Sequence, residues 1–208
     1  LAVASCQQYE QGYYVAYPHM IQQPLDLIVH VGDYIYEASW GKNLVRRHGT
    51  PEAFTLDDYR NRHALYRTDA DLQAAHAYCP WLVTWDDHEV ANDYADATSE
   101  QNDEPTLFLA RRAAAYRAYY EHMPVPRRAV PFGASMRLHA QRAFGDLASI
   151  YMLDGRQHRD VQACAPLGER GGSTGNCEPL RDPRRTYLGP QQEEWLVGQL
   201  ARSRTRWN

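Results

Sequence analysis

The sequence has no long hydrophobic run, no excess of basic residues and few phenylalanines. A membrane-spanning helix needs about 20 consecutive apolar residues, and no stretch approaches that length. Lys and Arg number 22 against 26 Asp and Glu, a formal net charge of −4, so the charge gives no support to a nucleic-acid-binding protein. The hydrophobic fraction of 44% and the charged fraction of 23% are typical of globular domains and exclude a disordered chain. We therefore expect neither a transmembrane segment nor specific nucleic-acid recognition.

Tyrosine, histidine and tryptophan are abundant instead, at 15, 9 and 5 residues against 4 phenylalanines. Their rings carry polar atoms, so the excess hints at a functional site as well as a core. A chain of 208 residues can bury a sizeable core as one domain or two small ones. The first residue is not Met and no Gly or Pro stop signal follows the last predicted helix, so we expect the protein to continue at both ends.

Cysteine is scarce, with 4 residues and no Cys-x-x-Cys pair, which disfavours a zinc finger. Cys164 and Cys177 flank a glycine-rich loop, and we predict a disulfide between them; two unrelated free thiols are the alternative. A disulfide closing a loop of this size stabilises by roughly 3 kcal/mol and implies an oxidising compartment. The prediction for location is therefore secreted or periplasmic. Cys79 has no acidic neighbour and is expected in the core.

Hydrophobic patterning predicts alternating strands and helices, hence an α/β fold. The run LDLIVHV at 25–31 is typical of a parallel strand buried on both faces. A capping-box signal at Thr55 opens a helix. Strands are expected at 1–5, 25–31, 81–85, 136–144 and 147–153, and helices at 11–23, 55–66, 70–77, 107–121 and 191–206.

Polar residues follow three of the predicted buried strands. Cys6 follows the first, Asp33 and Tyr36 follow the second, and the run Asp-Asp-His-Glu at 86–89 follows the third. In open α/β sheets, ligands bind beyond the carboxyl ends of the strands, so these side chains are expected to meet in one crevice. All of them belong to types that bind metals.

The run 86–89 places adjacent carboxylates after an apolar strand, and a metal cation is the simplest means of offsetting their repulsion. A helix N-terminus is the alternative, but it explains one Asp rather than the whole run. Gly32 permits a tight turn before Asp33, and Tyr36 lies three residues further on. A phenolate is a hard anionic ligand that favours Fe(III).

Other chemically active residues have plainer alternatives. Cys6 is a candidate ligand, but a free Cys is often a small buried hydrophobe. A further predicted strand delivers Asp154 and then Arg156. Arginine binds phosphate bidentately, although an Asp–Arg structural pair is the alternative. His30 is expected as a core histidine, and the arginines at 111–112 as a solvated helix face.

The segments at 4–9, 32–37, 84–90 and 153–156, together with the helix at 107–123, resemble the PhoD-type alkaline phosphatases, a branch of the metallophosphoesterases. The resemblance implies a four-layer α/β/β/α sandwich, incomplete at its C-terminus. On this interpretation, residues 1–208 are part of a single PhoD-type catalytic domain. The N-terminal family domain and the closing segment of metal ligands lie outside the chain.

The resemblance also implies a site with Fe(III) and Ca²⁺, although other divalent metals are compatible. Asp33 would bridge the two ions. The implied ligands are Cys6, Asp33, Tyr36 and Asp87, with Asp86 and Asp154 as additional candidates. His88, Arg156 and Asp87 are the implied catalytic residues: His88 would assist the leaving oxygen and Arg156 would hold the phosphate.

These residues predict a hydrolase in which a metal-activated water attacks phosphate monoesters or diesters at alkaline pH. Expected substrates are small phosphate esters, with phospholipid head groups and nucleotide diesters among them. A non-catalytic fragment that binds metal or phosphate is the alternative. An iron oxidoreductase is disfavoured, because the sequence shows no two-His, one-carboxylate pattern. The preference for monoesters or diesters and the oligomeric state stay open.

Overall fold

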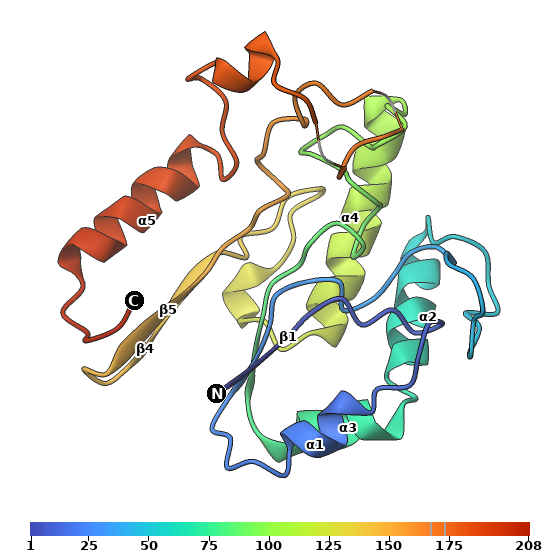
Figure 1. Cartoon of the computed structure of the whole chain (residues 1–208), viewed down its shortest axis with the longest axis vertical. Coiled ribbons are helices and arrows are strands. Elements are labelled where there is room, and N and C mark those ends of the chain that lie inside the picture. Colours follow the sequence, from blue (N-terminus) through green and yellow to red (C-terminus); the bar gives the residue numbers. More distant parts are fainter. Residues whose placement is uncertain (167, 173) are drawn as a thin grey trace.

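A computed structural model describes residues 1–166, 168–172 and 174–208 (Figure 1). Among these residues, a parallel sheet has the strand order β1-β2-β3, and β4 and β5 form a separate antiparallel pair. The strands are β1 (Ala2–Ala4), β2 (Ile28–His30), β3 (Trp81–Val83), β4 (Ala140–Phe144) and β5 (Ala148–Met152). The mixed α/β class predicted from the sequence is therefore confirmed.

The register of the parallel sheet aligns the carboxyl ends of its strands. Ala4 pairs with His30, and His30 pairs with Val83. The central strand β2 is buried along its whole length, as its continuous apolar run predicts. Because the three strands end side by side, the segments that follow them leave the sheet at one edge.

The helices are α1 (Ala16–Met20), α2 (Leu56–Tyr66), α3 (Ala70–Tyr78), α4 (Pro105–His122) and α5 (Pro190–Arg202), with short 3₁₀ turns at Arg127–Ala129 and Glu178–Arg181. The predicted capping box at α2 is confirmed: the Asp58 N–H donates to Thr55 Oγ1 at 3.2 Å, and the Thr55 N–H donates to Asp58 Oδ2 at 2.8 Å. A cap of this kind stabilises a helix by about 1 kcal/mol. Helices α2 and α4 pack against each other, and the short α1 lies on α3 (Figure 1).

Much of the tyrosine excess lies in the core. Tyr34, Tyr59, Tyr66 and Tyr116 are fully buried, and buried hydroxyls need partners. The Tyr59 hydroxyl donates to a backbone carbonyl, and the Tyr66 hydroxyl accepts the N–H of Tyr36 at 3.1 Å. Trp85 stacks on Tyr116 with ring centroids 4.2 Å apart. Most of these rings therefore serve packing rather than a site.

Two predicted helices are shorter than expected. Of the helix predicted at 11–23, only α1 forms. Proline is tolerated in the first turn of a helix but not in its interior, so Pro18 prevents the helix from starting earlier in the chain. The helix predicted at 191–206 ends at Arg202. Beyond it the chain turns back along β5, where the Ser149 N–H donates to the Trp207 carbonyl at 2.9 Å.

The strand predicted at 136–144 begins only at Ala140. The Met136 N–H donates to Gln157 Oε1 at 2.9 Å, and Gln157 Nε2 donates to the Met136 carbonyl at 2.9 Å. The side chain of Gln157 therefore takes up the backbone hydrogen bonds of Met136 that a neighbouring strand would otherwise form, and the strand starts later.

The prediction of a solvated face at 111–112 is wrong, because Arg111 and Arg112 of α4 are both buried. Arg111 donates to the Tyr59 hydroxyl at 2.8 Å and to Glu52 at 2.7 Å. Arg112 donates to the carbonyls of Ala134 at 3.0 Å and Asp96 at 2.7 Å. Each guanidinium thus joins α4 to a neighbouring loop.

The predicted disulfide between Cys164 and Cys177 is confirmed. Cys79 is partly buried and packs against the core, as expected. Across the described part of the chain, none of the helices has the length and apolar character that a membrane crossing requires.

Candidate metal centre

Two loops of unusual backbone geometry carry the first candidate ligands. Cys6 and Asp33 each have φ of 56°, a left-handed conformation that non-glycine residues seldom adopt. The loops run side by side, with the Cys6 N–H donating to the Gly32 carbonyl at 3.1 Å and the Gln7 N–H donating to the Asp33 carbonyl at 3.1 Å. Strained backbone of this kind persists where the surrounding structure holds it, often at functional sites.

Gly32 brings the loop after β2 against the loop after β3. Its φ is +118°, and a Cβ at this position would lie 2.5 Å from the backbone nitrogen of Asp86. Any side chain here would push the two loops apart. The glycine that precedes Asp33 in the sequence therefore permits the approach that assembles the site.

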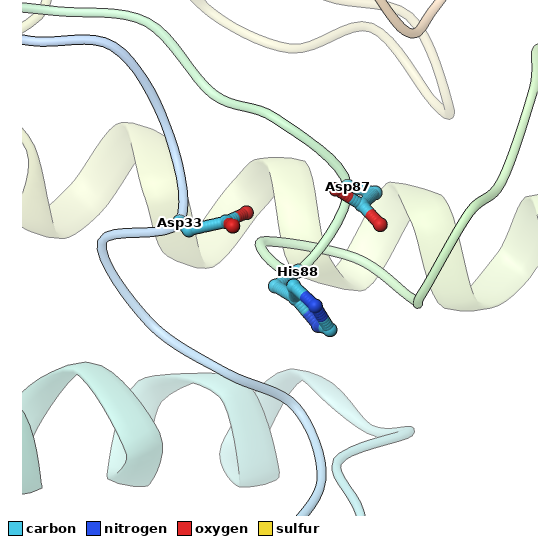
Figure 2. Close-up of side chains that lie close together, drawn as sticks. All are labelled: Asp33, Asp87 and His88. Carbon is cyan, nitrogen blue, oxygen red and sulfur yellow. The ribbon is translucent and has the colours of Figure 1, made fainter. Parts of the chain in front are cut away.

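Asp33, Asp87 and His88 form the centre of the site (Figure 2). Each residue offers a potential ligand atom, and these atoms all lie within 4.8 Å of one another. Figure 2 shows the Asp33 carboxylate directed toward the segment that carries Asp87 and His88. The structure thus brings together residues more than fifty positions apart, at the sheet edge predicted from the strand ends.

The Asp33 carboxylate lacks the partners that a buried anion requires. Its Oδ2 accepts the Tyr36 hydroxyl at 3.1 Å, whereas its Oδ1 is buried with no hydrogen-bond partner among the described residues. Burial, and next the charge of Asp87, raise the pKa of Asp33 to about 6. A cation would satisfy the orphaned oxygen and offset the repulsion, so these residues fit a bound metal.

Cys6 and Tyr36 lie beside Asp33, as predicted. Burial raises the pKa of the Cys6 thiol, and the nearby charge of Asp33 raises it further. Burial and then Asp33 likewise raise the pKa of the Tyr36 hydroxyl. Both groups are therefore neutral at pH 7, and a metal that bound them would have to displace their protons.

Arg156 joins the other predicted acidic residues. It donates through Nε to Asp86 Oδ1 at 2.5 Å and through a second guanidinium nitrogen to Asp87 Oδ1 at 3.0 Å. A third nitrogen lies 3.7 Å from Asp93 Oδ1. The Asp93 N–H donates to Asp87 Oδ2 at 2.6 Å, so both oxygens of Asp87 are oriented.

His88 is oriented by Glu37, a residue that the sequence analysis did not identify. His88 Nδ1 lies 2.8 Å from Glu37 Oε2, and its ring stacks on Tyr36 with centroids 4.1 Å apart. Burial lowers the pKa of His88, but the hydrogen bond and charge of Glu37 and the charges of Asp87 and Asp33 outweigh it, so that the pKa rises to about 9. The only sequence signal for this role is the position of Glu37, a carboxylate directly after the candidate ligand Tyr36.

Glu89 also has a role that the sequence analysis did not assign. Its Oε1 accepts the Tyr34 N–H at 2.7 Å, and its Oε2 accepts the N–H groups of Asp33 at 3.2 Å and Asp86 at 2.9 Å. Burial, followed by the charge of Asp33, raises the pKa of Glu89 to about 8. The last acid of the run at 86–89 therefore joins the two ligand-bearing loops.

Asp154, an additional candidate ligand, is engaged elsewhere. It is fully buried. Its Oδ1 accepts Trp85 Nε1 at 2.9 Å and the N–H groups of Arg156 and Gln157 at 3.0 Å, and its Oδ2 accepts Gln157 Nε2 at 2.9 Å. This carboxylate fixes the turn that presents Arg156 and does not enter the cluster of Asp33, Asp87 and His88.

Comparison with known proteins accounts for this arrangement. The family profile described as PhoD-like phosphatase matches residues 1–208. The chain belongs to the PhoD-like phosphatase family. It is 50% identical over 214 residues to alkaline phosphatase D of Bacillus subtilis (strain 168), an alignment that takes in 100% of this chain and 36% of that protein.

A solved structure of PhoD has the same fold, with a TM-score of 0.93 and 50% sequence identity. The match covers 99% of this chain and 40% of the solved one. The chain thus spans well under half the length of the PhoD relatives it matches. The described residues carry the parallel sheet and the cluster of Asp33, Asp87 and His88 within this shared region.

Proposed function

We propose that the protein containing this chain hydrolyses phosphate esters at the cluster of Asp33, Asp87 and His88. The convergence of these side chains at one sheet edge, in a chain of the PhoD-like phosphatase family, carries the proposal. Each contributes a metal-binding group, and the unpartnered Asp33 oxygen supplies the place for a cation.

The proposed ligands of Fe(III) are Cys6, Asp33 and Tyr36, and the proposed ligand of a neighbouring Ca²⁺ is Asp87, with Asp33 shared. Other divalent metals fit the carboxylates as well. When bound, the ions supply positive charge and a water acidic enough to react near neutral pH. Asp86 and Asp87 both pair with Arg156, and Asp86 is an additional candidate metal ligand.

The chain's own residues have distinct proposed roles. His88, held by Glu37, donates a hydrogen bond to the leaving oxygen. Arg156 keeps Asp87 oriented, and its guanidinium is the proposed hydrogen-bond donor that holds the phosphate. Glu89 keeps the Asp33 and Asp86 loops at a fixed separation.

We further propose that residues 1–208 form part of one catalytic domain whose whole fold is a four-layer α/β/β/α sandwich. The shared 36% and 40% of the two relatives support a larger domain to which other segments contribute ligands. The disulfide supports a secreted or periplasmic location. Proposed substrates are small monoesters or diesters, including phospholipid head groups and nucleotide diesters.

The test uses the full-length protein with p-nitrophenyl phosphate and its bis ester, before and after chelation and after metal is restored. Asp33→Asn keeps the size of the side chain but removes its charge, so we expect turnover to fall by at least about 10³-fold, consistent with a group in direct contact with the metal. Asp57→Asn is the matched control, because the Asp57 side chain is 83% exposed.

A metal-loaded wild-type protein that binds phosphate but hydrolyses neither ester would overturn the proposal and favour a binding module. Full activity in Asp33→Asn would also contradict it. A violet colour from charge transfer between Tyr36 and Fe(III) distinguishes iron from other metals, and its loss in Tyr36→Phe assigns the ligand.

A further inference from the structure

A cavity of about 270 Å³ lies next to the candidate metal centre. Its walls include Asp93, Arg156, Arg159, Gln162, Arg170 and Gly171. A water molecule occupies about 30 Å³ in the liquid, so the cavity has room for a group of phosphate or carboxylate size. Nothing in the roles proposed for the centre uses Arg159, Gln162 or Arg170.

The cavity and the metal centre share a wall. Arg156 donates to Asp87 at 3.0 Å, and the Asp93 N–H donates to the other oxygen of Asp87 at 2.6 Å. Both Arg156 and Asp93 also line the cavity. A group held in the cavity would therefore lie beside Arg156 and Asp93, the two residues that also hydrogen-bond to Asp87.

The arginines of this wall differ in their charge balance. Arg156 lies within 4.0 Å of three carboxylates, those of Asp86, Asp87 and Asp93, which more than offset its charge. Neither Arg159 nor Arg170 has a carboxylate within 4.0 Å among the residues that the structure describes. The Arg159 guanidinium lies over the Tyr187 ring at 4.5 Å, and Arg170 donates to the Ser99 carbonyl at 2.5 Å. Two positive charges without a carboxylate partner therefore face one cavity.

The disulfide-closed loop positions the second of these arginines. Gln162 Oε1 accepts the Gly171 N–H at 2.5 Å, and Gln162 Nε2 donates to the Gly172 carbonyl at 2.8 Å. Gly171 has φ of +85°, and a Cβ there would overlap the Asp93 carboxylate. The loop thus lies against Asp93, whose N–H donates to Asp87, with Arg170 at the cavity.

We propose that Arg159 and Arg170 form an anion subsite for a second negatively charged group on the alcohol part of the substrate. Paired guanidinium groups suit phosphate and carboxylate oxygens alike. The preferred substrates are then phosphate esters whose alcohol part carries another anionic group. This inference rests on the proposed function and deepens it.

The test compares phenyl phosphate with 4-carboxyphenyl phosphate in the full-length, metal-loaded protein, by release of inorganic phosphate. The wild type is expected to have the higher kcat/KM on the carboxylated ester. In the double variant Arg159→Gln, Arg170→Gln, kcat/KM for that ester falls by about tenfold or more, the effect of one lost charge-assisted hydrogen bond. For phenyl phosphate, kcat/KM changes by less than about threefold, because no second anion is involved.

Arg184→Gln is the matched control, because Arg184 is 88% exposed, pairs with Asp182 and is not among the residues that line the cavity. An equal loss on both esters, or no loss on either, overturns the subsite. If the wild type hydrolyses neither ester, the proposed function fails. Equilibrium binding of 4-carboxyphenyl phosphate to wild type and double variant then decides the subsite alone: weaker binding by the variant supports it and equal binding contradicts it.

Discussion

At the scale of single residues, the candidate centre depends on carboxylates that touch backbone as much as on those that would touch metal. Glu89 accepts N–H groups from both loops that carry ligands, and Glu37 orients His88 and accepts the Asn92 N–H at 2.6 Å. Neither role is readable from local spacing, because Glu89 and Asp33 are 56 residues apart and Glu37 and His88 are 51 apart. The residues that follow the strands, by contrast, were predictable from the sheet edge they share.

Glu89→Gln tests the clamp between the loops. Above pH 8, where the Glu89 carboxylate is ionised, both of its oxygens accept backbone N–H groups. A glutamine in the same position places an NH₂ group against one of these donors, so at least one buried N–H loses its acceptor. We expect the free energy of unfolding to fall by about 1–3 kcal/mol. Turnover falls as well, because Asp33 and Asp86 lose their fixed separation.

Urea unfolding and p-nitrophenyl phosphate hydrolysis measure the two effects on the same preparation of Glu89→Gln. Glu178→Gln is the control, because Glu178 is exposed. Unchanged stability together with unchanged turnover would show that the two loops keep their positions without the Glu89 carboxylate.

At the scale of elements, patterning succeeded where local sequence decides the outcome. The buried run of β2 and the capping box of α2 are such cases. Predictions failed where a distant side chain intervened: Gln157 satisfies the backbone of Met136, and partners from other loops draw Arg111 of α4 into the interior. Long-range hydrogen bonds of this kind leave no periodic signal in the sequence.

The loop closed by the disulfide can be tested directly by replacing its two cysteines. Cys164 and Cys177 are separated by 13 positions. Replacing both by Ser should lower the free energy of unfolding by roughly 3 kcal/mol, the chain-entropy value for such a loop. The same loop carries Arg170 and Gly171 to the cavity. We therefore expect kcat/KM for the carboxylated ester to fall more than kcat/KM for phenyl phosphate.

Denaturant unfolding and the ratio of kcat/KM for the two esters provide the readouts for the double Ser variant. Cys79→Ser is the control, because Cys79 is a free thiol outside the loop. Reductant added to the wild type should reproduce the double variant. If reduction alters stability but leaves the ester ratio unchanged, the loop does not position Arg170.

At the scale of the whole molecule, several of the nine histidines are interior groups rather than site residues. His30 is fully buried in β2, and burial lowers its pKa to about 3. His76 stacks on Trp81 with centroids 3.8 Å apart, and its pKa is also lowered to about 3, chiefly by burial. Both imidazoles are therefore neutral in the folded protein at pH values where the unfolded chain protonates them.

This difference makes stability depend on pH in a defined direction. Between the ordinary histidine pKa of about 6.5 and the folded value of about 3, the unfolded chain binds more protons than the folded one. Stability from each histidine is therefore fully present above pH 6.5 and is lost as the pH falls through that window. Each contributes a slope of up to about 1.4 kcal/mol per pH unit.

His30→Gln and His76→Gln isolate these contributions, because every other titrating group is common to variant and wild type. We expect urea unfolding of the wild type between pH 6.5 and pH 5 to show a steeper loss of stability on acidification than either variant shows. The window stays above the ordinary carboxyl pKa values of about 4, so acid titration of surface groups adds little. His19→Gln, in the short helix α1, is the control, because His19 is exposed. Parallel slopes for wild type and both variants would mean that these two imidazoles are protonated in the folded protein, and that the core tolerates their charge.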